Sequence, residues 1–223
     1  MENFRILEIK ESVFGDNNKM ADSLRKDLKS KGVFLLNVMS SPGSGKTSTI
    51  VKTIEYLKDL NIGVMEADID SAVDAETVSK TGAKVIQLHT GGMCHLDAEM
   101  TKQGLEGLGT DNLDLVILEN VGNLVCPAEF DTGSSKNIMI LSVPEGDDKP
   151  LKYPLMFSIC DILLINKIDA IENFDFDFKA VEERAKNINP NIKIIPISAK
   201  KNENIDKFAD WIKDEIKKWK ENK

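Results

Sequence analysis

The eight residues from Ser40 to Thr47 constrain this chain more than any other stretch, because they place glycines, a lysine and a threonine between two patterned runs. The run before them, 34–39, reads as a buried strand, and residues 48–60 carry apolar side chains at helical spacing. A strand, a glycine-rich loop, Lys-Thr and a helix in this order predict a cradle for nucleotide phosphates. Loop N–H groups and the positive helix N-terminus surround the phosphate oxygens in such a cradle.

Individual residues of this phosphate-binding loop (the P-loop, Ser40–Thr47) have separate expected roles. Lys46 is expected to reach the β- and γ-phosphates, and the Thr47 hydroxyl to bind Mg²⁺. One departure from the usual pattern is visible, because Ser40 stands where the first glycine is normally found. The residues expected to contact the phosphates are Gly43, Ser44, Gly45, Lys46, Thr47 and Ser48.

Composition narrows the class of protein. The chain has 223 residues, a formal net charge of −8 and a pI near 5.0, and no Lys/Arg run is interleaved with aromatic residues. Nucleic acid is therefore not an expected partner. No apolar stretch approaches the ~20 residues needed to cross a bilayer, and the first residues lack a secretory signal pattern. Three cysteines suit a reducing compartment. We expect a cytoplasmic protein without a membrane partner.

Predicted strands and helices alternate along the chain, which favours the α/β class. Strands are predicted at 34–39, 61–67, 84–89, 114–119, 137–143, 161–166 and 193–197, and helices at 17–30, 48–60, 75–80, 94–108, 177–188 and 204–219. The expected architecture is a three-layer P-loop NTPase fold, with a mostly parallel sheet flanked by helices. We expect residues 1–32 to form an N-terminal extension with an accessory helix, and residues 33–223 to form the nucleotide-binding (G) domain.

Aspartates cluster just after the strand that follows the P-loop helix. Asp68, Asp70 and Asp74 lie within seven positions, and carboxylates at the carboxyl end of a strand beside a P-loop are well placed to hold Mg²⁺. Asp74 and Asp68 are the better candidates, and Asp70 is the weakest. The alternative for each is a charged turn that caps the next helix.

The base specificity is predicted by a second motif. Asn166-Lys167-Ile168-Asp169 ends a buried strand, and a carboxylate there can accept hydrogen bonds from N1–H and the 2-amino group of guanine, which adenine lacks. The Asn side chain can contact the other base edge, while the Lys stem packs along the ring. Ser198-Ala199-Lys200 ends the next strand and strengthens the motif. GTP and GDP are therefore expected, rather than ATP.

A third segment is expected to sense the γ-phosphate. Glu119-Asn120-Val121-Gly122 stands where GTPases carry Asp-x-x-Gly, and the Gly122 N–H can bond a γ-phosphate. The chain has only three arginines and none is beside these motifs, so slow, Mg²⁺-dependent hydrolysis is expected. The residues expected to support hydrolysis are Lys46, Thr47, Asp68, Asp74 and Glu119, with Thr47 and Asp74 as Mg²⁺ ligands.

Two cysteines and a histidine suggest a transition-metal site. Cys94 and His95 are adjacent, and Cys126 lies seven residues past Glu119 on the segment that senses phosphate. Two thiolates and an imidazole suit Zn²⁺ or Ni²⁺. We expect Cys94 to open a helix and therefore to have a lowered thiol pKa. The alternative is that these side chains are buried for packing alone, as we expect for Cys160.

These motifs together resemble the HypB family, the GTPases that assist nickel insertion into [NiFe]-hydrogenase. The resemblance runs from about residue 33 to the C-terminus, and its most specific strings are Cys94-His95-Leu96-Asp97-Ala98 and the run Glu119–Pro127. It implies a GTP-dependent homodimer with Cys94, His95 and Cys126 binding Zn²⁺ or Ni²⁺ at the interface. It also implies a hydrogenase large-subunit precursor and a nickel-binding accessory protein as partners.

The resemblance is incomplete at the N-terminus. Some members of the family carry a Cys-rich or His-rich nickel motif there, whereas residues 1–32 contain neither Cys nor His. Two other functions remain open. One is a urease-type nickel-insertion GTPase, in which a Cys-Pro-His string is expected instead of the strings found here. The other is an ATP-dependent P-loop phosphotransferase whose cysteines are structural.

Overall fold

A computed structural model describes residues 4–8, 14–68 and 73–221 of the chain. The strands are β1 (Phe4–Glu8), β2 (Phe34–Ser40), β3 (Ile62–Asp68), β4 (Lys84–His89), β5 (Leu115–Glu119), β6 (Lys136–Ser142), β7 (Ile162–Asn166) and β8 (Lys193–Pro196). The α-helices are α1 (Phe14–Lys31), α2 (Lys46–Tyr56), α3 (Val73–Ser79), α4 (Ala98–Leu108), α5 (Cys126–Glu129), α6 (Lys149–Lys152), α7 (Pro154–Ile159), α8 (Phe178–Ile188) and α9 (Ile205–Glu221). Short 3₁₀ turns are η1 (Val143–Glu145) and η2 (Ile168–Asn173).

The strands form one sheet in the order β1-β4-β3-β5-β2-β6-β7-β8, and every ladder between named strands is parallel. Parallel strands need a crossover between them, which is why helices separate most of them along the chain. The predicted α/β class and parallel sheet are confirmed. Strand β1 lies in the predicted N-terminal extension, where only a helix was predicted, and it extends the sheet beyond β4.

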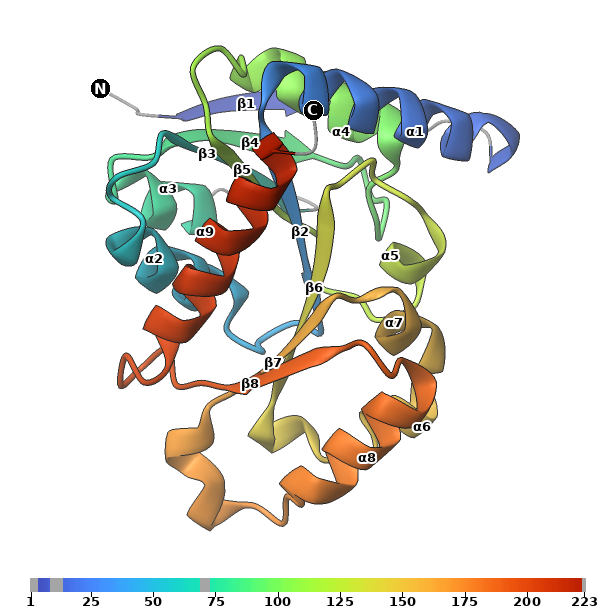
Figure 1. Ribbon diagram of the computed structural model, residues 1–223, viewed down its shortest axis with the longest axis vertical. Helices are drawn as coiled ribbons and strands as arrows, with labels where there is room; N and C mark the ends of the chain where they lie inside the picture. Colours follow the sequence, from blue (N-terminus) through green and yellow to red (C-terminus); the bar gives the residue numbers. More distant parts are fainter. Residues whose placement is uncertain (1–3, 9–13, 69–72, 222–223) are drawn as a thin grey trace.

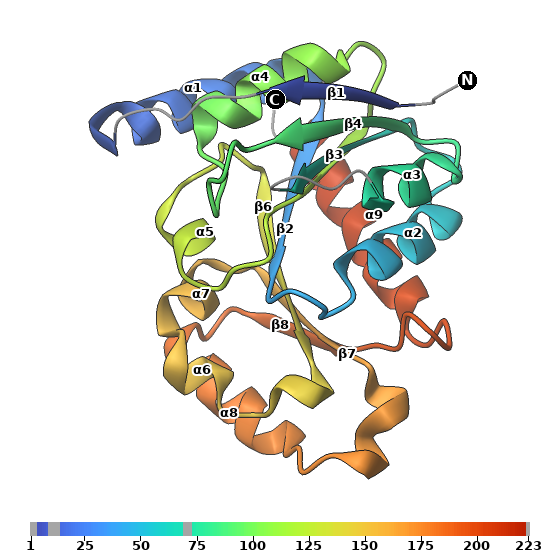
Figure 2. The same cartoon turned by 180° about the vertical axis from the view of Figure 1, so that it is seen from behind.

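Helices cover both faces of this sheet (Figures 1 and 2). Apolar side chains of β2, β3 and β5 pack on one face against α2, α3 and α9, and the core there includes Leu36, Ile54 and Ile212. On the other face α1 and α4 cover Leu35, Met65 and their neighbours. A third cluster lies under α7 and α8, beside β6 and β7. The buried strands are apolar on both sides for this reason, as predicted for β5.

The order of the strands places the motif-bearing loops together. Strand β2 has β5 on one side and β6 on the other. After β2 the chain forms β3, β4 and β5 in one half of the sheet, and then β6, β7 and β8 in the other half. Loops at the carboxyl ends of strands meet along one edge, and ligands of open α/β sheets bind where the strand order reverses. The P-loop and the segments after β5 and β7 all lie on this edge (Figure 2).

Two predicted helix boundaries are wrong by four residues. The helix predicted at 48–60 ends at Tyr56. The helix expected from Cys94 begins at Ala98, because Asp97 caps it and its side chain accepts a hydrogen bond from the Met100 N–H at 2.8 Å. Cys94 and His95 therefore lie in the turn before α4. The short helices α5, α6 and α7 were not predicted, and each has a proline in its first turn, where the missing N–H costs nothing.

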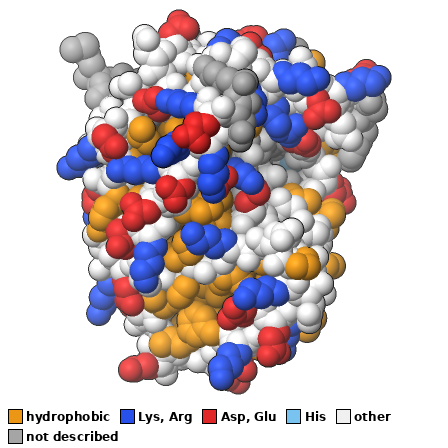
Figure 3. Space-filling model, viewed as in Figure 1, with side chains coloured by type: hydrophobic (Ala, Val, Ile, Leu, Met, Phe, Trp, Pro, Cys, Tyr) orange, Lys and Arg blue, Asp and Glu red, His pale blue; other side chains and the backbone are white. Residues whose placement is uncertain are grey.

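The N-terminal segment packs onto the rest of the molecule. Helix α1 lies alongside α4, and β1 pairs with β4 from Phe4↔Val85 to Glu8↔His89. The division at residue 32 stays a prediction. On the face drawn in Figure 3, Lys and Arg side chains are interspersed with Asp and Glu. Among the described helices, none is both long and apolar enough to cross a membrane.

Candidate functional site

The P-loop is closed by its own hydroxyl groups. The buried Ser40 hydroxyl accepts hydrogen bonds from the Ser44 hydroxyl at 2.6 Å and from the Lys46 ammonium at 3.1 Å. It donates to the Ser41 carbonyl oxygen at 2.8 Å. The serine that replaces the usual glycine therefore organises the loop. Lys46 points back across the loop, toward the position that phosphates take in this motif.

Gly45 cannot be replaced without moving a neighbouring motif. Its φ of 97° lies in the left-handed region, and a Cβ there would be 2.5 Å from the Asn166 amide nitrogen. The same Asn166 amide donates to the Ser44 carbonyl oxygen at 2.9 Å, and its oxygen accepts from the Ala199 N–H at 3.1 Å. Asn166 thus ties the P-loop to the loop after β8. The sequence predicts a base contact for Asn166 but does not reveal this role.

A cavity of about 450 Å³ opens beside the P-loop. Its walls come from the start of α2, the ends of β3 and β5, and the first turn of α3. The residues around it are Pro42, Gly43, Gly45, Lys46, Thr47, Ser48, Glu66, Ala67, Asp74, Glu119, Asn120, Val121 and Gly122. Four of the five residues predicted to support hydrolysis therefore line one space. Asp68 ends β3, but its side chain lies outside the described part of the chain, as does Asp70 entirely.

Two buried carboxyl groups lie together on the floor of this cavity. Glu66 and Glu119 are partners in the β3–β5 register, and both are at least 97% buried, with exposures of 2% and 3%. Burial, followed by the neighbouring Glu119 charge, raises the pKa of Glu66 well above its ordinary value. Burial also raises the pKa of Glu119, against the lowering effects of Lys46 and Thr47. The pair holds a proton more tightly than isolated carboxyls do.

The Thr47 hydroxyl donates to Glu119 Oε1 at 2.9 Å, while Glu119 Oε2 and Glu66 Oε1 have no partner within the described structure. Unpartnered buried oxygens that face a cavity are suited to a cation or an ordered water. Together with Thr47 and Asp74 in the same cavity wall, these oxygens are the donor type that Mg²⁺ prefers. Glu66 was missed by the sequence analysis, although a carboxylate within the apolar strand Ile62–Asp68 is a signal that could have found it.

A second cavity of about 540 Å³ adjoins the first, since Gly45 and Ser48 line both. The predicted guanine motif forms its wall through Asn166, Lys167 and Asp169, together with Ala199 and Lys200. Ser198 is not in the wall, but its hydroxyl donates to Asp169 Oδ1 at 2.6 Å and fixes that carboxylate. Lys167 has a left-handed backbone and donates to the Gly43 carbonyl oxygen at 2.6 Å. The two cavities can take the phosphate end and the base end of one nucleotide.

The segment from Glu119 to Cys126, here called the sensor loop, runs close beside the P-loop. A Cβ on Gly122 would lie 3.0 to 3.1 Å from Pro42 side-chain and backbone atoms, so a larger residue would push the two loops apart. The buried Asn120 amide donates to Asn37 Oδ1 on β2 at 3.2 Å, which anchors the start of the loop. Gly122 is therefore held next to the place where the phosphates are expected.

Cys94, His95 and Cys126 meet at the far end of the sensor loop. One ligand atom from each lies within 4.8 Å of the others, and the Cys94 and Cys126 sulfurs are 2.9 Å apart. His95 is buried and its ring stacks on Phe130, with centroids 3.7 Å apart. Two sulfurs and an imidazole that converge from two loops suit a tetrahedral Zn²⁺ or a Ni²⁺ ion. The geometry fits such an ion better than an assignment to packing alone.

The predicted lowering of the Cys94 thiol pKa is wrong. Hydrogen bonding to Cys126, followed by burial, raises the pKa of Cys94 above its ordinary value. The reason is structural, because Cys94 lies four residues before the first residue of α4 and gains no helix dipole. The third cysteine, Cys160, is only 1% exposed and packs in the core under α7, as predicted.

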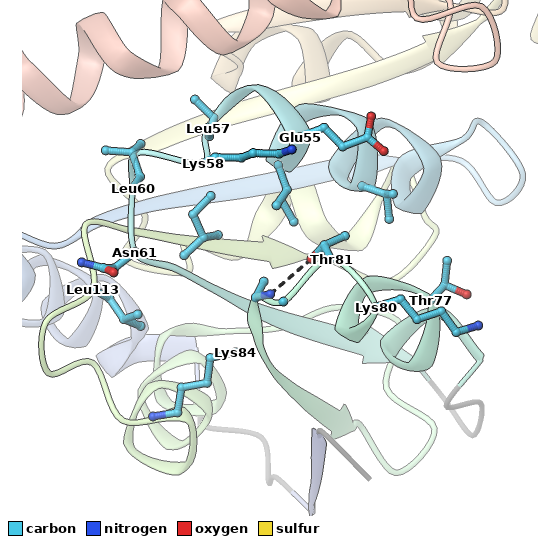
Figure 4. A pocket seen from close by; sticks show the side chains of 15 residues that line it. Glu55, Leu57, Lys58, Leu60, Asn61, Thr77, Lys80, Thr81, Lys84 and Leu113 are labelled. Carbon is cyan, nitrogen blue, oxygen red and sulfur yellow. Dashed lines mark hydrogen bonds between the residues drawn. The ribbon is translucent and has the colours of Figure 1, made fainter. Parts of the chain in front are cut away.

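A larger cavity, of about 800 Å³, lies elsewhere (Figure 4). It is bordered by the end of α2, the end of α3 and the beginnings of β3 and β4, with Leu57, Leu60 and Leu113 in its wall. This is the amino-end edge of the sheet, opposite to the edge where ligands of such sheets bind. Of the predicted site residues whose side chains the structure describes, none lines it.

Comparison with known proteins gives a consistent result. The family model described as CobW/HypB/UreG, nucleotide-binding domain, matches residues 34–196. The hydrogenase maturation factor HypB of Rhizobium leguminosarum bv. viciae is 42% identical over 213 residues, which cover 95% of this chain and 71% of that protein. The hydrogenase/urease maturation factor HypB of Helicobacter hepaticus is 39% identical over 94% of this chain and 88% of that protein. A crystal structure of HypB from Helicobacter pylori in complex with nickel superposes with a TM-score of 0.86 at 37% identity, over 91% of this chain and 96% of that one.

Proposed function

Because the chain belongs to the HypB family, we propose that it is a GTP-hydrolysing metallochaperone switch that assists nickel insertion during [NiFe]-hydrogenase maturation. One observation carries the proposal. The sensor loop begins in the wall of the phosphate cavity at Glu119 and ends at the metal-site residue Cys126. A change at the nucleotide is therefore transmitted to the metal ligands through eight residues of backbone, 119–126.

The nucleotide is proposed to be GTP. Asp169 is fixed by Ser198 with its second oxygen available to the cavity wall, which suits the paired donors on the guanine edge. Adenine offers no such pair of donors at this edge. Lys167 packs between this cavity and the P-loop, where its bond to Gly43 links base recognition to the phosphate cradle. These hydrogen bonds match the donors of guanine and not those of adenine, which explains the proposed preference for GTP over ATP.

Hydrolysis is proposed to be slow and to require Mg²⁺. When bound, Mg²⁺ supplies charge neutralisation at the β- and γ-phosphate oxygens. Thr47 and Asp74 are the proposed ligands, and Glu119 orients Thr47 through its hydrogen bond. Lys46 lies on the same wall and offers a positive charge to the phosphates. The side chains of Arg25 and Arg184 bind carboxylates elsewhere, at Asp131 and Asp147, so neither is proposed to act on the phosphates.

The transition metal is proposed to be cargo held at the Cys94–His95–Cys126 site. Thiolate and imidazole ligands favour Ni²⁺ and Zn²⁺ over Mg²⁺. The transition metal and Mg²⁺ are therefore expected to bind at different sites. Three ligands leave a coordination position open, and an open position is what handover to another protein requires. The receiving partners are proposed to be a hydrogenase large-subunit precursor and a nickel-binding accessory protein.

A GTP-dependent homodimer is proposed on similar grounds. Val125 adjoins Cys126 and is 50% exposed, and the exposed Leu151 and Leu155 belong to α6 and α7, which pack next to each other. Helix α7 also packs against α5, the helix that Cys126 opens. Large apolar side chains gathered beside a metal site with an open position suit a second copy of the chain.

A second candidate function is urease-type nickel insertion. It is favoured by the Helicobacter hepaticus relative, which is described as a hydrogenase/urease maturation factor. Restoring hydrogenase or urease activity in cells that lack their own nickel-insertion GTPase separates the two functions. The proposal predicts that hydrogenase activity is restored, and restoration of urease activity alone would contradict it.

Nucleotide titration tests the enzymatic part of the proposal. Calorimetry with GDP, ADP and their triphosphates should show that guanine nucleotides bind at least about tenfold more tightly than adenine nucleotides. Phosphate release from GTP should occur only when Mg²⁺ is present. Preferential binding of ATP would favour a phosphotransferase with structural cysteines and would overturn the switch.

A further inference from the structure

The side chain of Asn17 on α1 joins two segments that are distant in sequence. Its amide nitrogen donates to the Asp131 carbonyl oxygen at 3.0 Å, and its amide oxygen accepts from the Ala98 N–H at 2.8 Å. Asn17 is only 3% exposed, and its bond with Ala98 is buried while its bond with Asp131 is partly buried. The two segments are those that carry the metal-site residues, since Ala98 follows His95 by three positions and Asp131 follows Cys126 by five.

The metal site depends on how these two segments are placed relative to each other. Cys94 and His95 come from the turn after β4, whereas Cys126 comes from the loop after β5. The ligand atoms of all three converge within 4.8 Å only if the two segments keep their spacing. Ala98 N–H is also an orphan donor of the first turn of α4, so Asn17 fixes the helix end as well as the loop.

A second residue of α1 holds the same loop. The Arg25 guanidinium binds both Asp131 carboxylate oxygens at 2.8 Å, and its Nε donates to the Ser134 carbonyl oxygen at 2.9 Å. Gly133, with a φ of 74°, packs so closely that a Cβ would lie 2.9 Å from a Leu24 methyl carbon. The loop of residues 131–134 is thus held against α1 by charge-assisted hydrogen bonds from Arg25 and by the close packing of Gly133 on Leu24.

We propose that Asn17 is a positioning residue of the metal site, which holds the two ligand-bearing segments at the spacing that a Ni²⁺ or Zn²⁺ ion requires. The inference rests on the proposed metal binding. It gives α1 a role in that function beyond covering the sheet. Asn17 is no ligand itself, and it acts on the ion through the backbone at Ala98 and Asp131. Supporting contacts of this kind commonly change metal affinity when they are removed.

The test compares Asn17→Ala with Asn18→Ala in the full chain. Asn18 is the exposed neighbour of the same residue type and serves as a matched control. Calorimetry with Ni²⁺ alone should show affinity reduced about 10- to 100-fold for Asn17→Ala. Affinity for GDP should remain within about twofold of the wild type, because the nucleotide cavities contain no residue of α1. Asn18→Ala should match the wild type in both measurements.

Two further variants keep the outcome decisive. Arg25→Gln changes a half-buried side chain and leaves Asn17 in place, so this variant should fold. Its loss of Ni²⁺ affinity should be smaller than that of Asn17→Ala. Adding Asn17→Ala to Cys126→Ala should lower the residual Ni²⁺ affinity no further, since the positioned ligand is already gone. Unchanged Ni²⁺ affinity in folded Asn17→Ala, or equal losses of Ni²⁺ and GDP affinity in both α1 variants, would overturn the inference. Failure of the wild type to bind Ni²⁺ would overturn the metal site itself.

Discussion

The Asn123 side-chain amide donates a hydrogen bond to the Cys94 carbonyl oxygen at 3.3 Å. Asn123 directly follows Gly122, the residue that packs on the P-loop at Pro42. Its amide oxygen accepts from the Val125 N–H at 2.9 Å and so shapes the turn into Cys126. One side chain in the sensor loop therefore contacts both segments of the metal site.

Asn123→Ala should weaken the coupling between nucleotide and metal. The variant keeps all three metal-site residues and every residue of the phosphate cavity, so the metal alone and the nucleotide alone should still bind. The factor by which metal affinity differs between the GDP and GTP-analogue states should fall toward one. Metal titrations in each nucleotide state measure this factor. A variant that keeps the full wild-type factor would assign the coupling to the backbone of the loop alone.

Removing a phosphate or Mg²⁺ contact should abolish hydrolysis. Lys46→Ala removes the charge on the phosphate wall, and Thr47→Ala removes the hydroxyl bonded to Glu119, so each should lower the GTPase rate by at least about 100-fold. Asp74→Ala should act likewise, since Asp74 lines the same cavity from α3. Steady-state phosphate release measures the rates. An unchanged rate for Asp74→Ala would remove Asp74 from the Mg²⁺ site.

Asp169→Asn should change the preferred base. The substitution turns an acceptor toward the base into a donor, so GTP binding should weaken by roughly 2–3 kcal/mol while xanthine nucleotides, whose ring accepts at that position, gain. Ser198 still holds the side chain, because its hydroxyl can bond to the amide oxygen. Competition between GDP and xanthosine diphosphate measures the change. A variant that keeps the wild-type preference for GDP over xanthosine diphosphate would exclude this base contact.

Glu66→Gln should stabilise the nucleotide-free protein, and more so as the pH rises. The folded pKa of Glu66 is raised by burial and by Glu119, so the native state holds a proton that the unfolded chain releases above its ordinary carboxyl pKa. Wild-type stability therefore falls as the pH rises from that ordinary value toward the raised one, and the neutral amide avoids this loss.

Urea unfolding without nucleotide measures the effect of Glu66→Gln at pH 5 and pH 7.5. The exposed Glu183→Gln is the control and should change stability little at either pH. A stabilisation by Glu66→Gln that does not grow with pH would show that the pKa of Glu66 is not raised in the folded protein.

The sequence predicted those parts of the molecule that depend on local pattern. The apolar run of β5 and the glycine spacing of the P-loop are readable because each has a local physical cause. The base contact of Asn166 stays a prediction, but its amide also joins Ser44 to Ala199, residues more than a hundred positions apart, and the sequence analysis did not predict this role. No periodicity carries information on such a contact.

The same limit explains why the start of α4 was predicted wrongly and why the roles of Glu66 and Asn17 were missed. The position of Cys94 before α4 depends on Asp97 as the cap, which the sequence analysis did not identify. The proximity of Glu66 to Glu119 arises only from the β3–β5 register, which a single sequence does not specify. Asn17 lies in a polar helix whose pattern indicates no more than a covering role.

The central claim is that nucleotide state and metal binding are coupled through the sensor loop, and calorimetric titration of the wild type with Ni²⁺ tests it most directly. The titration is performed with GDP and with a non-hydrolysable GTP analogue, and Cys126→Ala is the control that should lose metal binding while keeping nucleotide binding. The account predicts different Ni²⁺ affinities in the two states, with a coupling of ~1–3 kcal/mol. Equal affinities in the two states would contradict the account and leave two independent sites on one domain.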